Sequence, residues 1–570
     1  MRQPLCSLLR IGLAGRQHIS TLGINAKGSR KFAIFAPQQS RSLEKTVERL
    51  KKQAIPVFQP QEREYEHLIA TSNLLYRFSR PNCVIQPENA TQVQAIINEA
   101  RSEKLKVTIK CNGHSYAGHS TAFDGISLDL RRMQGVSLNA RDMTVDIDAG
   151  CQWGHVYGKL IDGRHDGLII NGGRCPTVGV SGFMLGGGLG PFTRSFGMGC
   201  DTMMEATVVT ADGKLVTVGE KDDPQSKEGR LFWALRGAGG GNFGVMVKMK
   251  LKVQKLKNRH GMVVAGRHQW FPEGGFDNNE FMKTMNDFYL TDWPKNITVD
   301  STWICDLRDK GNLDGVRFTI SFDGSKGEYD RLIEKHIKST RFLYETLVNQ
   351  WMEETERAYP TNKTYELYSS FVFTNNDKAT IEKVTAEIRD LMAEFRELFK
   401  GEKVNFLVTW IHAGGRATEF EPTQTAYFWR QAVFHTYVTI EWVDKWMELD
   451  MRKFLGKIKK RLRPHSLGGK AAFINFPDRD FPLRTHEAMY FGDNRDELRR
   501  VKEMWDPKNF FKWDQGVKLP QTASQDRNAA EGEDGVDDEG RTDSVAGEQW
   551  DYFKPKDVIE ELDELADMGF

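Results

Sequence analysis

Three glycine-rich segments constrain this chain more than any other feature of its sequence. They are residues 111–118, 172–190 and 233–244. Glycine can adopt positive φ angles and has no Cβ atom, so successive backbone N–H groups can surround an anion and a phosphate can approach closely. Two of the segments also carry a nucleophilic side chain, His114 in the first and Cys175 in the second. The pattern predicts one pyrophosphate-containing cofactor that the protein holds at two points.

A nucleotide-binding fold of the Rossmann type is the rival interpretation. Residues 239–244 satisfy the pattern Gly-x-Gly-x-x-Gly. That fold requires a helix directly after the glycines and an acidic residue about 20 residues further on. Here residues 245–253 alternate apolar and basic side chains, which is typical of a strand, and the next acidic residue is Glu273. The sequence therefore disfavours an NAD-dependent enzyme.

The three segments resemble the flavin-binding segments of the berberine-bridge-enzyme-like oxidases, in the vanillyl-alcohol-oxidase superfamily. The resemblance covers roughly residues 75–518. It implies an α+β fold with a PCMH-type FAD-binding domain of two α/β subdomains and a substrate domain whose antiparallel sheet is covered by helices. It also implies FAD attached twice, through His114 to the 8α-methyl carbon and through Cys175 to C6 of the flavin ring. Arg174 and local N–H dipoles would favour the reactive Cys175 thiolate.

The resemblance also implies which other residues contact the flavin. These are Asn112, Gly113, Ser115, Tyr116, Thr177, Val178, Gly179, Gly182, Gly186, Gly187, Gly188, Gly190, Gly244, Val245 and Asn475. Val180 stands where relatives control the access of dioxygen, and valine there resembles the oxidases, which produce hydrogen peroxide. A dehydrogenase with another electron acceptor is the alternative. We expect no metal site.

The base that removes the substrate proton is harder to assign. When flavin oxidises a carbon that bears a hydroxyl, a base must take the hydroxyl proton as the carbonyl forms. In many relatives this base is a tyrosine, helped by a second one, but the corresponding positions here are Phe473, Phe476 and Phe196. Phenylalanine cannot accept a proton. Because of this departure, an alternative is that the chain binds flavin but no longer catalyses a reaction.

Glu441 is the predicted replacement base. In relatives the corresponding strand carries Glu or Gln five residues before a Trp. Here Glu441 lies five residues before Trp446. A carboxylate in an aromatic pocket would have a raised pKa and could act as a base near neutrality. The alternative is a solvent-facing Glu on an alternating strand. Further candidates are Tyr437, His435 and Asp478, and Tyr116 or His119 could orient the substrate.

The pattern along the chain predicts several parts. We expect a targeting presequence (1–43), a helix and linker (44–74), the FAD-binding domain (75–258), the substrate-binding domain (259–469), a return to the FAD-binding domain (470–519), an acidic disordered linker (520–550) and an amphipathic helix (551–570). Residues 526–548 contain nine acidic and two basic residues and few apolar ones, which is typical of disorder. The final helix would dock onto a partner or onto the same molecule.

Composition restricts the class of protein. The chain has 570 residues, of which 39% are hydrophobic, enough for at least two cores because single domains rarely exceed about 250–300 residues. Its 79 basic and 78 acidic residues nearly cancel, so no global charge favours nucleic acid, and a small-molecule substrate fits better. No apolar run reaches the roughly 20 residues of a transmembrane helix.

The N-terminal segment predicts a mitochondrial location. Its first 43 residues contain seven basic and no acidic residues among Leu, Ser and Gly, which is typical of a transit peptide. A secretory signal would need an uninterrupted apolar core, and Arg10 interrupts the candidate. Secretion stays the alternative, since glycosylation sequons occur at Asn89, Asn296 and Asn362.

Overall fold

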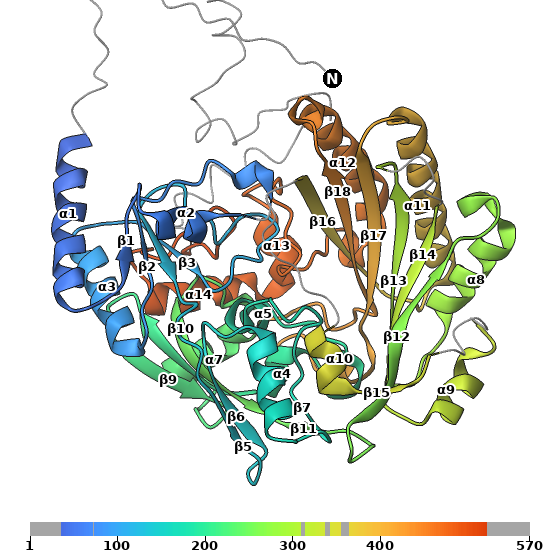
Figure 1. Cartoon of the computed structure of the whole chain (residues 1–570), viewed down its shortest axis with the longest axis horizontal. Helices are drawn as coiled ribbons and strands as arrows, with labels where there is room; N and C mark the ends of the chain where they lie inside the picture. The colour runs from blue at the N-terminus through green and yellow to red at the C-terminus, as the bar shows by residue number, and fades with distance from the viewer. Residues whose placement is uncertain (1–35, 72, 309–313, 337–342, 355–363, 521–570) are drawn as a thin grey trace, which may run out of the picture. The chain divides into compact units, whose positions relative to one another are not determined.

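The computed structural model describes residues 36–71, 73–308, 314–336, 343–354 and 364–520 (Figure 1). The chain divides into two compact units, Met1–Lys518 and Leu519–Phe570. Most of the predicted presequence, the acidic linker beyond residue 520 and the predicted C-terminal helix lie outside the described residues. The first described element is helix α1 (Ala36–Lys52), which includes the helix predicted near residue 44. Among the described residues, no helix combines the length and apolar character needed to cross a bilayer.

The chain up to residue 518 forms two main parts, which we call the FAD-binding part and the substrate part after the expectation for each. The FAD-binding part contains two main sheets. The first has the order β1-β2-β4-β3, and β4 pairs in parallel with both of its neighbours. The second is antiparallel, with the order β5-β6-β10-β8-β9. The strands are β1 (Val57–Phe58), β2 (Cys83–Ile85), β3 (Val107–Lys110), β4 (Ile126–Asp129), β5 (Val136–Asn139), β6 (Thr144–Asp148), β8 (Met203–Thr210), β9 (Leu215–Gly219) and β10 (Gly244–Lys252).

Local sequence signals explain several of these elements. Helix α3 (Ala90–Ser102) begins at Asn89, whose side chain accepts a hydrogen bond from the Gln92 N–H and so satisfies a free donor of the first turn. The dipeptide Asp212-Gly213, which is typical of a hairpin turn, joins β8 and β9, with Gly213 at φ +79°. The other helices of this part are α2 (Arg63–Ile69), α4 (Trp153–Asp162), α5 (Val180–Leu185), α6 (Thr193–Phe196) and α7 (Lys227–Ala238). A small pair, β7 (Leu168–Ile169) with β11 (Gln254–Lys255), completes it.

The substrate part is built on one seven-stranded antiparallel sheet with the order β15-β12-β14-β13-β17-β18-β16. Its strands are β12 (Met262–Trp270), β13 (Ile297–Asp306), β14 (Gly315–Phe322), β15 (Glu345–Leu347), β16 (Tyr365–Phe373), β17 (Val404–His412) and β18 (Phe434–Trp442). Its helices are α8 (Asn279–Leu290), α9 (Lys326–Ile333), α10 (Val348–Glu354), α11 (Lys378–Leu398) and α12 (Glu448–Leu462).

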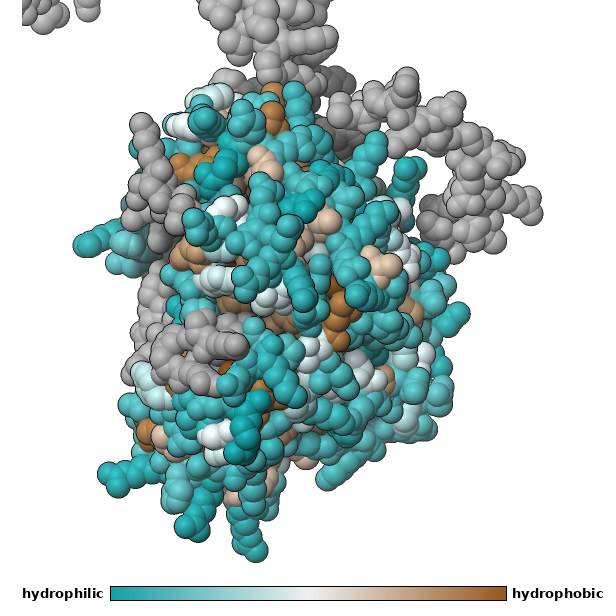
Figure 2. Space-filling model, turned by 90° about the vertical axis from the view of Figure 1, so that its right-hand side faces the viewer, coloured by the Kyte–Doolittle hydropathy of each residue, from teal (hydrophilic) through white to brown (hydrophobic). Residues whose placement is uncertain are grey.

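One face of this sheet is covered by helices. In Figure 1, α8, α11 and α12 lie along it, and their apolar side chains form one core with the strands. The side of the molecule turned toward the viewer in Figure 2 is mostly hydrophilic. On β18, residues such as Val438 and Trp442 point into that core, so alternation places His435, Tyr437 and Glu441 on the opposite face. That opposite face is therefore available for a site.

The last described segment rejoins the FAD-binding part, as the resemblance implied. Helix α13 (His486–Phe491) contributes Tyr490 and Phe491, and helix α14 (Arg495–Trp505) contributes Leu498 and Val501, to the core that contains β10. The buried Lys502 ammonium donates to the Asn242 and Phe511 carbonyls and pairs with Asp506 at 2.8 Å. The two parts thus belong to one folded unit in which the chain leaves the first domain and returns to it.

Candidate functional site

His114 and Cys175 converge on one residue. The Cys175 Sγ atom lies 3.2 Å from the Thr177 hydroxyl, and the His114 ring interacts with the Thr177 backbone. Burial lowers the pKa of His114, and that backbone hydrogen bond opposes the shift. The imidazole is therefore neutral at neutral pH, which is the form able to attack a carbon atom. Two nucleophiles from separate glycine-rich segments thus contact the same residue.

The loop that carries His114 has backbone donors to offer. No hydrogen bond within the described chain uses the N–H groups of Asn112, Gly113, His114 or Ser115. Gly113 has φ +78°, a conformation that favours glycine. The Asn112 side chain holds the loop in place, because it donates to the Gly150 carbonyl at 3.2 Å and accepts from Gln152 at 3.0 Å. This rigid row of free donors fits the phosphates or ring carbonyls of FAD.

The glycines of the second segment fall into two kinds. A Cβ atom on Gly186 would lie 2.0 Å from the Asn475 side chain, and one on Gly190 would lie 2.0 Å from the Gly172 carbonyl oxygen. Protein packing explains these two. Gly182 differs, because it is exposed next to the buried Ser181 and a Cβ atom there would meet nothing within 4 Å. The open space at Gly182 is what a cofactor cradle would leave.

The remaining predicted flavin residues lie around these loops. The Val178 carbonyl accepts from the Trp153 N–H, and the Ser115 hydroxyl accepts from the His119 N–H. Gly179 packs against Cys111, Gly187 and Gly188 have positive φ angles, and Gly244 and Val245 begin β10 beside β8. Val180 is fully buried at the start of α5, and its N–H donates to the Cys151 carbonyl. The role of Val180 toward dioxygen stays a prediction.

Arg174, which was expected to act on the Cys175 thiol, forms an ion pair with Asp300. Its guanidinium forms two hydrogen bonds with the Asp300 carboxylate and donates to the Leu189 carbonyl at 3.0 Å. Both side chains are mostly buried, at 15% and 8% exposure. Arg174 thus ties the Cys175 loop to β13 through Asp300, and its role toward the Cys175 thiol stays a prediction.

A group of aromatic rings lies beside the His114 loop. The Tyr116 ring, two residues after His114, stacks on the Tyr368 ring with centroids 4.2 Å apart. Tyr116 also lies 6.1 Å from Tyr437 and 6.0 Å from Phe476, and the Tyr437 and Phe476 rings are 4.5 Å apart. We call Tyr116, Tyr368, Tyr437 and Phe476 the aromatic cluster. It joins the flavin loop, the sheet and the C-terminal return.

The sequence analysis missed Tyr368 and its neighbour Glu366. The Tyr368 hydroxyl donates to the Glu366 carboxylate, which also accepts from the Thr364 hydroxyl at 3.0 Å. Burial raises the pKa of Glu366 to about 7, the Tyr368 hydrogen bond opposes this, and the nearby Glu441 carboxylate adds to it. Burial and the Glu366 charge also hold the pKa of Tyr368 well above its ordinary value. The alternation of residues along β16 could have shown that Glu366 and Tyr368 share one face of the strand. The pairing of β16 with β18 could not be predicted from the sequence.

Glu441 contacts polar side chains, whereas an aromatic pocket was expected around it. Its carboxylate pairs with Arg308 at 3.1 Å and accepts from Asn405 at 3.3 Å. Trp446, which defined the expected spacing, is 66% exposed, whereas Trp442 is fully buried. Tyr437 lies five residues before the buried Trp442 and belongs to the aromatic cluster. If the buried Trp442 is used for the count, the position five residues before the Trp is held by Tyr437 and not by Glu441. The catalytic role of Glu441 stays a prediction.

The other candidates have structural contacts. His435 is buried, burial lowers its pKa to about 3, and its Nε2 atom lies 2.8 Å from the Tyr427 hydroxyl. Burial likewise lowers the pKa of His119 to about 3, and its ring packs on Trp513. The buried Asp478 pairs with Lys459 at 3.2 Å. Both histidines are therefore neutral, and neither is poised to take a proton near pH 7.

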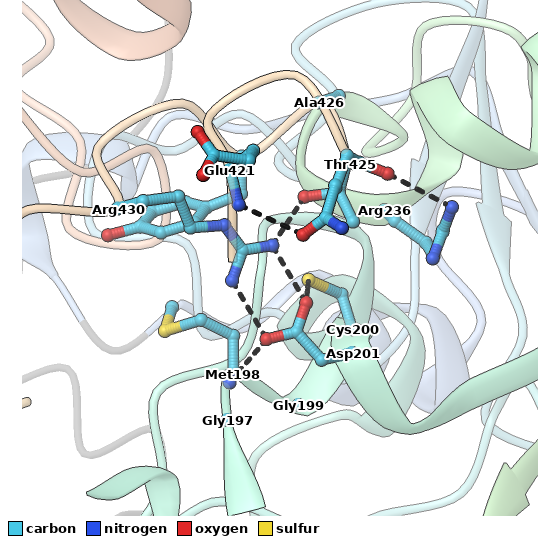
Figure 3. A network of polar contacts seen from close by, with 12 residues as sticks. Gly197, Met198, Gly199, Cys200, Asp201, Arg236, Glu421, Thr425, Ala426 and Arg430 are labelled. Carbon is cyan, nitrogen blue, oxygen red and sulfur yellow. Dashed lines mark hydrogen bonds and ion pairs between the residues drawn. The ribbon is translucent and has the colours of Figure 1, made fainter. Parts of the chain in front are cut away.

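A buried ion pair links the turn that follows the second glycine-rich segment to the connection between β17 and β18 (Figure 3). Arg430 donates to both carboxylate oxygens of Asp201 at 2.7 and 2.8 Å, and each side chain is 1% exposed. Asp201 also accepts from the Met198 N–H, and Arg430 donates to the Thr425 hydroxyl. The pair fixes the connection between β17 and β18, which carries Tyr427 and thereby positions His435.

The fold and the loops define a flavin-dependent oxidoreductase. Residues 81–219 match the family described as "FAD binding domain", and residues 472–518 match "Berberine and berberine like". Both matches agree with the resemblance of this chain to the berberine-bridge-enzyme-like FAD-linked oxidoreductases.

Relatives and solved structures agree with this assignment. The chain is 25% identical to an uncharacterized FAD-linked oxidoreductase of Bacillus subtilis, over 77% of this chain and 91% of that one. It is 24% identical to tetrahydroberberine oxidase of Argemone mexicana, over 81% and 88%. Among solved structures, chitooligosaccharide oxidase matches with a TM-score of 0.68, 20% identity and coverage of 84% and 100%. A variant of berberine bridge enzyme matches with a TM-score of 0.71, 17% identity and coverage of 84% and 100%.

Proposed function

We propose that this protein is an oxidase with doubly attached FAD, which oxidises a small organic alcohol or sugar and passes the electrons to dioxygen. The observation that carries the proposal is the convergence of His114 and Cys175 on Thr177. When bound, FAD would supply the two-electron oxidation of the substrate carbon and the reaction with dioxygen that yields hydrogen peroxide.

The chain's own residues would hold and shield the cofactor. The neutral His114 and the Cys175 sulfur would fix the ring at two points, and the free N–H groups of residues 112–115 would bind its oxygen atoms. The aromatic cluster supports a substrate position next to the His114 loop, since its rings come from Tyr116 and from the open face of the sheet. Arg174 and Arg430 would keep the loops and the sheet in fixed relation.

The attachment is tested by denaturing the purified protein in acid and measuring the flavin absorbance that stays with the polypeptide. We expect retention in the wild type and in each of His114→Ala and Cys175→Ala, because one bond suffices, and loss in the double variant. Matched controls are His260→Ala, at an exposed histidine, and Cys305→Ala, at a buried cysteine of the sheet. Release of flavin from the wild type would contradict double attachment.

The reaction is tested by adding a panel of alcohols and oligosaccharides and measuring hydrogen peroxide. The panel includes chito- and xylooligosaccharides, because solved neighbours are named for oxidising them. Peroxide formed in proportion to substrate consumed would support an oxidase. Reduction of the flavin without peroxide, followed by reoxidation with an artificial acceptor, would indicate a dehydrogenase instead.

A further inference from the structure

We propose that Tyr368 and Glu366 form the proton acceptor of this enzyme, an inference that rests on the proposed oxidation of a hydroxyl-bearing carbon. The substrate O–H proton passes to the Tyr368 oxygen while the Tyr368 proton passes to the Glu366 carboxylate. The carbon–hydrogen bond breaks with its electron pair, which the oxidised FAD takes up, and a carbon–oxygen double bond forms. The pair would replace the tyrosines that are absent at Phe473 and Phe476.

The position of Tyr368 supports this role. Strand β16 pairs with β18 so that Tyr368 lies opposite Thr439, and Ser370 lies opposite Tyr437. Tyr368 therefore shares the open face of the sheet with Tyr437, away from the helices. Its ring stacks on Tyr116, in the loop that carries His114. The phenol is thus next to the place where the flavin would be attached.

Contacts at both ends of β16 hold the strand that carries Tyr368 and Glu366. The Ser370 hydroxyl accepts from the Phe473 N–H at 3.0 Å, which ties this strand to the C-terminal return. At the other end, the Asn73 side chain donates to the Glu366 carbonyl at 2.8 Å and accepts from the Glu366 N–H. Both residues of the pair are held from their backbone, so the Tyr368 hydroxyl keeps its acceptor when substrate enters.

The surroundings of Glu366 suit a group that gains a proton during turnover. The titratable and charged groups that face it are Tyr368 on its own strand and Glu441 on β18, which is itself paired with Arg308. The Thr364 hydroxyl completes its partners. Burial raises the pKa of Glu366 to about 7, close to the working pH of a general base. Because the pKa is raised, the carboxylate is ionised and able to accept only above that pH.

The first test needs no substrate. Infrared difference spectra of the holoenzyme, recorded against pH, report protonation of a buried carboxyl group. We expect a carboxyl signal that titrates near pH 7 in the wild type and disappears in Glu366→Gln. In Tyr368→Phe the midpoint should move upward, since the lost hydrogen bond lowers the Glu366 pKa in the wild type. A wild-type spectrum without this titration would overturn the proposal, even if the flavin is attached.

The second test measures the rate of flavin reduction in the absence of oxygen, with the best substrate of the panel above. Tyr368→Phe and Glu366→Gln should each lower this rate by about 10²–10⁴-fold, the usual contribution of a positioned base. Their acid-stable flavin should equal that of the wild type, which separates failure of the proton acceptor from failure of flavin attachment. The same changes at exposed residues, Tyr344→Phe and Glu397→Gln, serve as matched controls.

The pH profile then distinguishes a base from a structural residue. In the wild type, kcat/KM should rise with pH around 7, and Glu366→Gln should remove that rise. If Tyr368→Phe reduces flavin within a few-fold of the wild-type rate while Tyr437→Phe is strongly impaired, Tyr437 is the base and the proposal is wrong.

Discussion

At the scale of single residues, Asp201 and Arg430 form an ion pair in which each side chain is only 1% exposed. Removing one partner leaves the other buried without a counter-charge, which costs about 3–5 kcal/mol. We therefore expect Asp201→Asn, which keeps the shape, to lower the free energy of unfolding by that order, as measured by urea denaturation. Glu382→Gln breaks an exposed pair with Lys378 and should cost under about 1 kcal/mol. Equal costs for the two variants would contradict this account.

Short motifs single out the candidate residues for flavin attachment. His114 and Cys175 each stand in a recognisable glycine-rich loop, and the structure places both against Thr177, while their bonds to flavin stay a prediction. Tyr368 was not predicted, because its importance depends on β16 lying next to β18, a pairing that sequence spacing does not specify. The spacing that singled out Glu441 was counted from Trp446, which is exposed, because only the alternation of β18 shows that Trp442 is the buried residue.

At the scale of elements, two glycines of the second segment should behave in opposite ways. Gly190→Ala brings a Cβ atom against the Gly172 backbone, which cannot move aside, so this variant should unfold more easily. Gly182→Ala places its Cβ atom in open space at a helix, where alanine is favoured over glycine by about 0.5–1 kcal/mol.

If that open space holds FAD, Gly182→Ala should keep or raise the stability of the flavin-free protein yet bind less flavin. Thermal unfolding of the flavin-free protein and the ratio of flavin to protein absorbance measure the two effects. Normal flavin content in Gly182→Ala would mean that the cofactor does not occupy this space.

Secondary structure followed from local patterns more reliably than the site did. Helices α3 and α11 begin directly after the capping residues Asn89 and Asp377, because caps are local properties of the sequence. The order of the seven strands depends on long-range packing, so the face that carries Tyr368 and Tyr437 could not be deduced in the same way.

At the scale of the whole molecule, the predicted presequence concerns the subcellular location of the protein. We expect residues 1–43, fused to a fluorescent protein, to direct it to mitochondria, because seven basic and no acidic residues occur there. Replacing Arg2, Arg10 and Arg16 by Glu should abolish import, as fluorescence microscopy would show. Delivery of the fusion to the culture medium would instead favour the secreted alternative.

Strand β16 is the last strand of its sheet and forms a ladder with one neighbour, β18. A residue exchanged on such a strand disturbs one set of cross-strand contacts, whereas an exchange on β13 or β17 disturbs two. Acid–base groups placed on β16 can therefore be replaced during evolution at small structural cost. A lineage that had lost the tyrosines of the C-terminal return could acquire a new proton acceptor here without rebuilding its core.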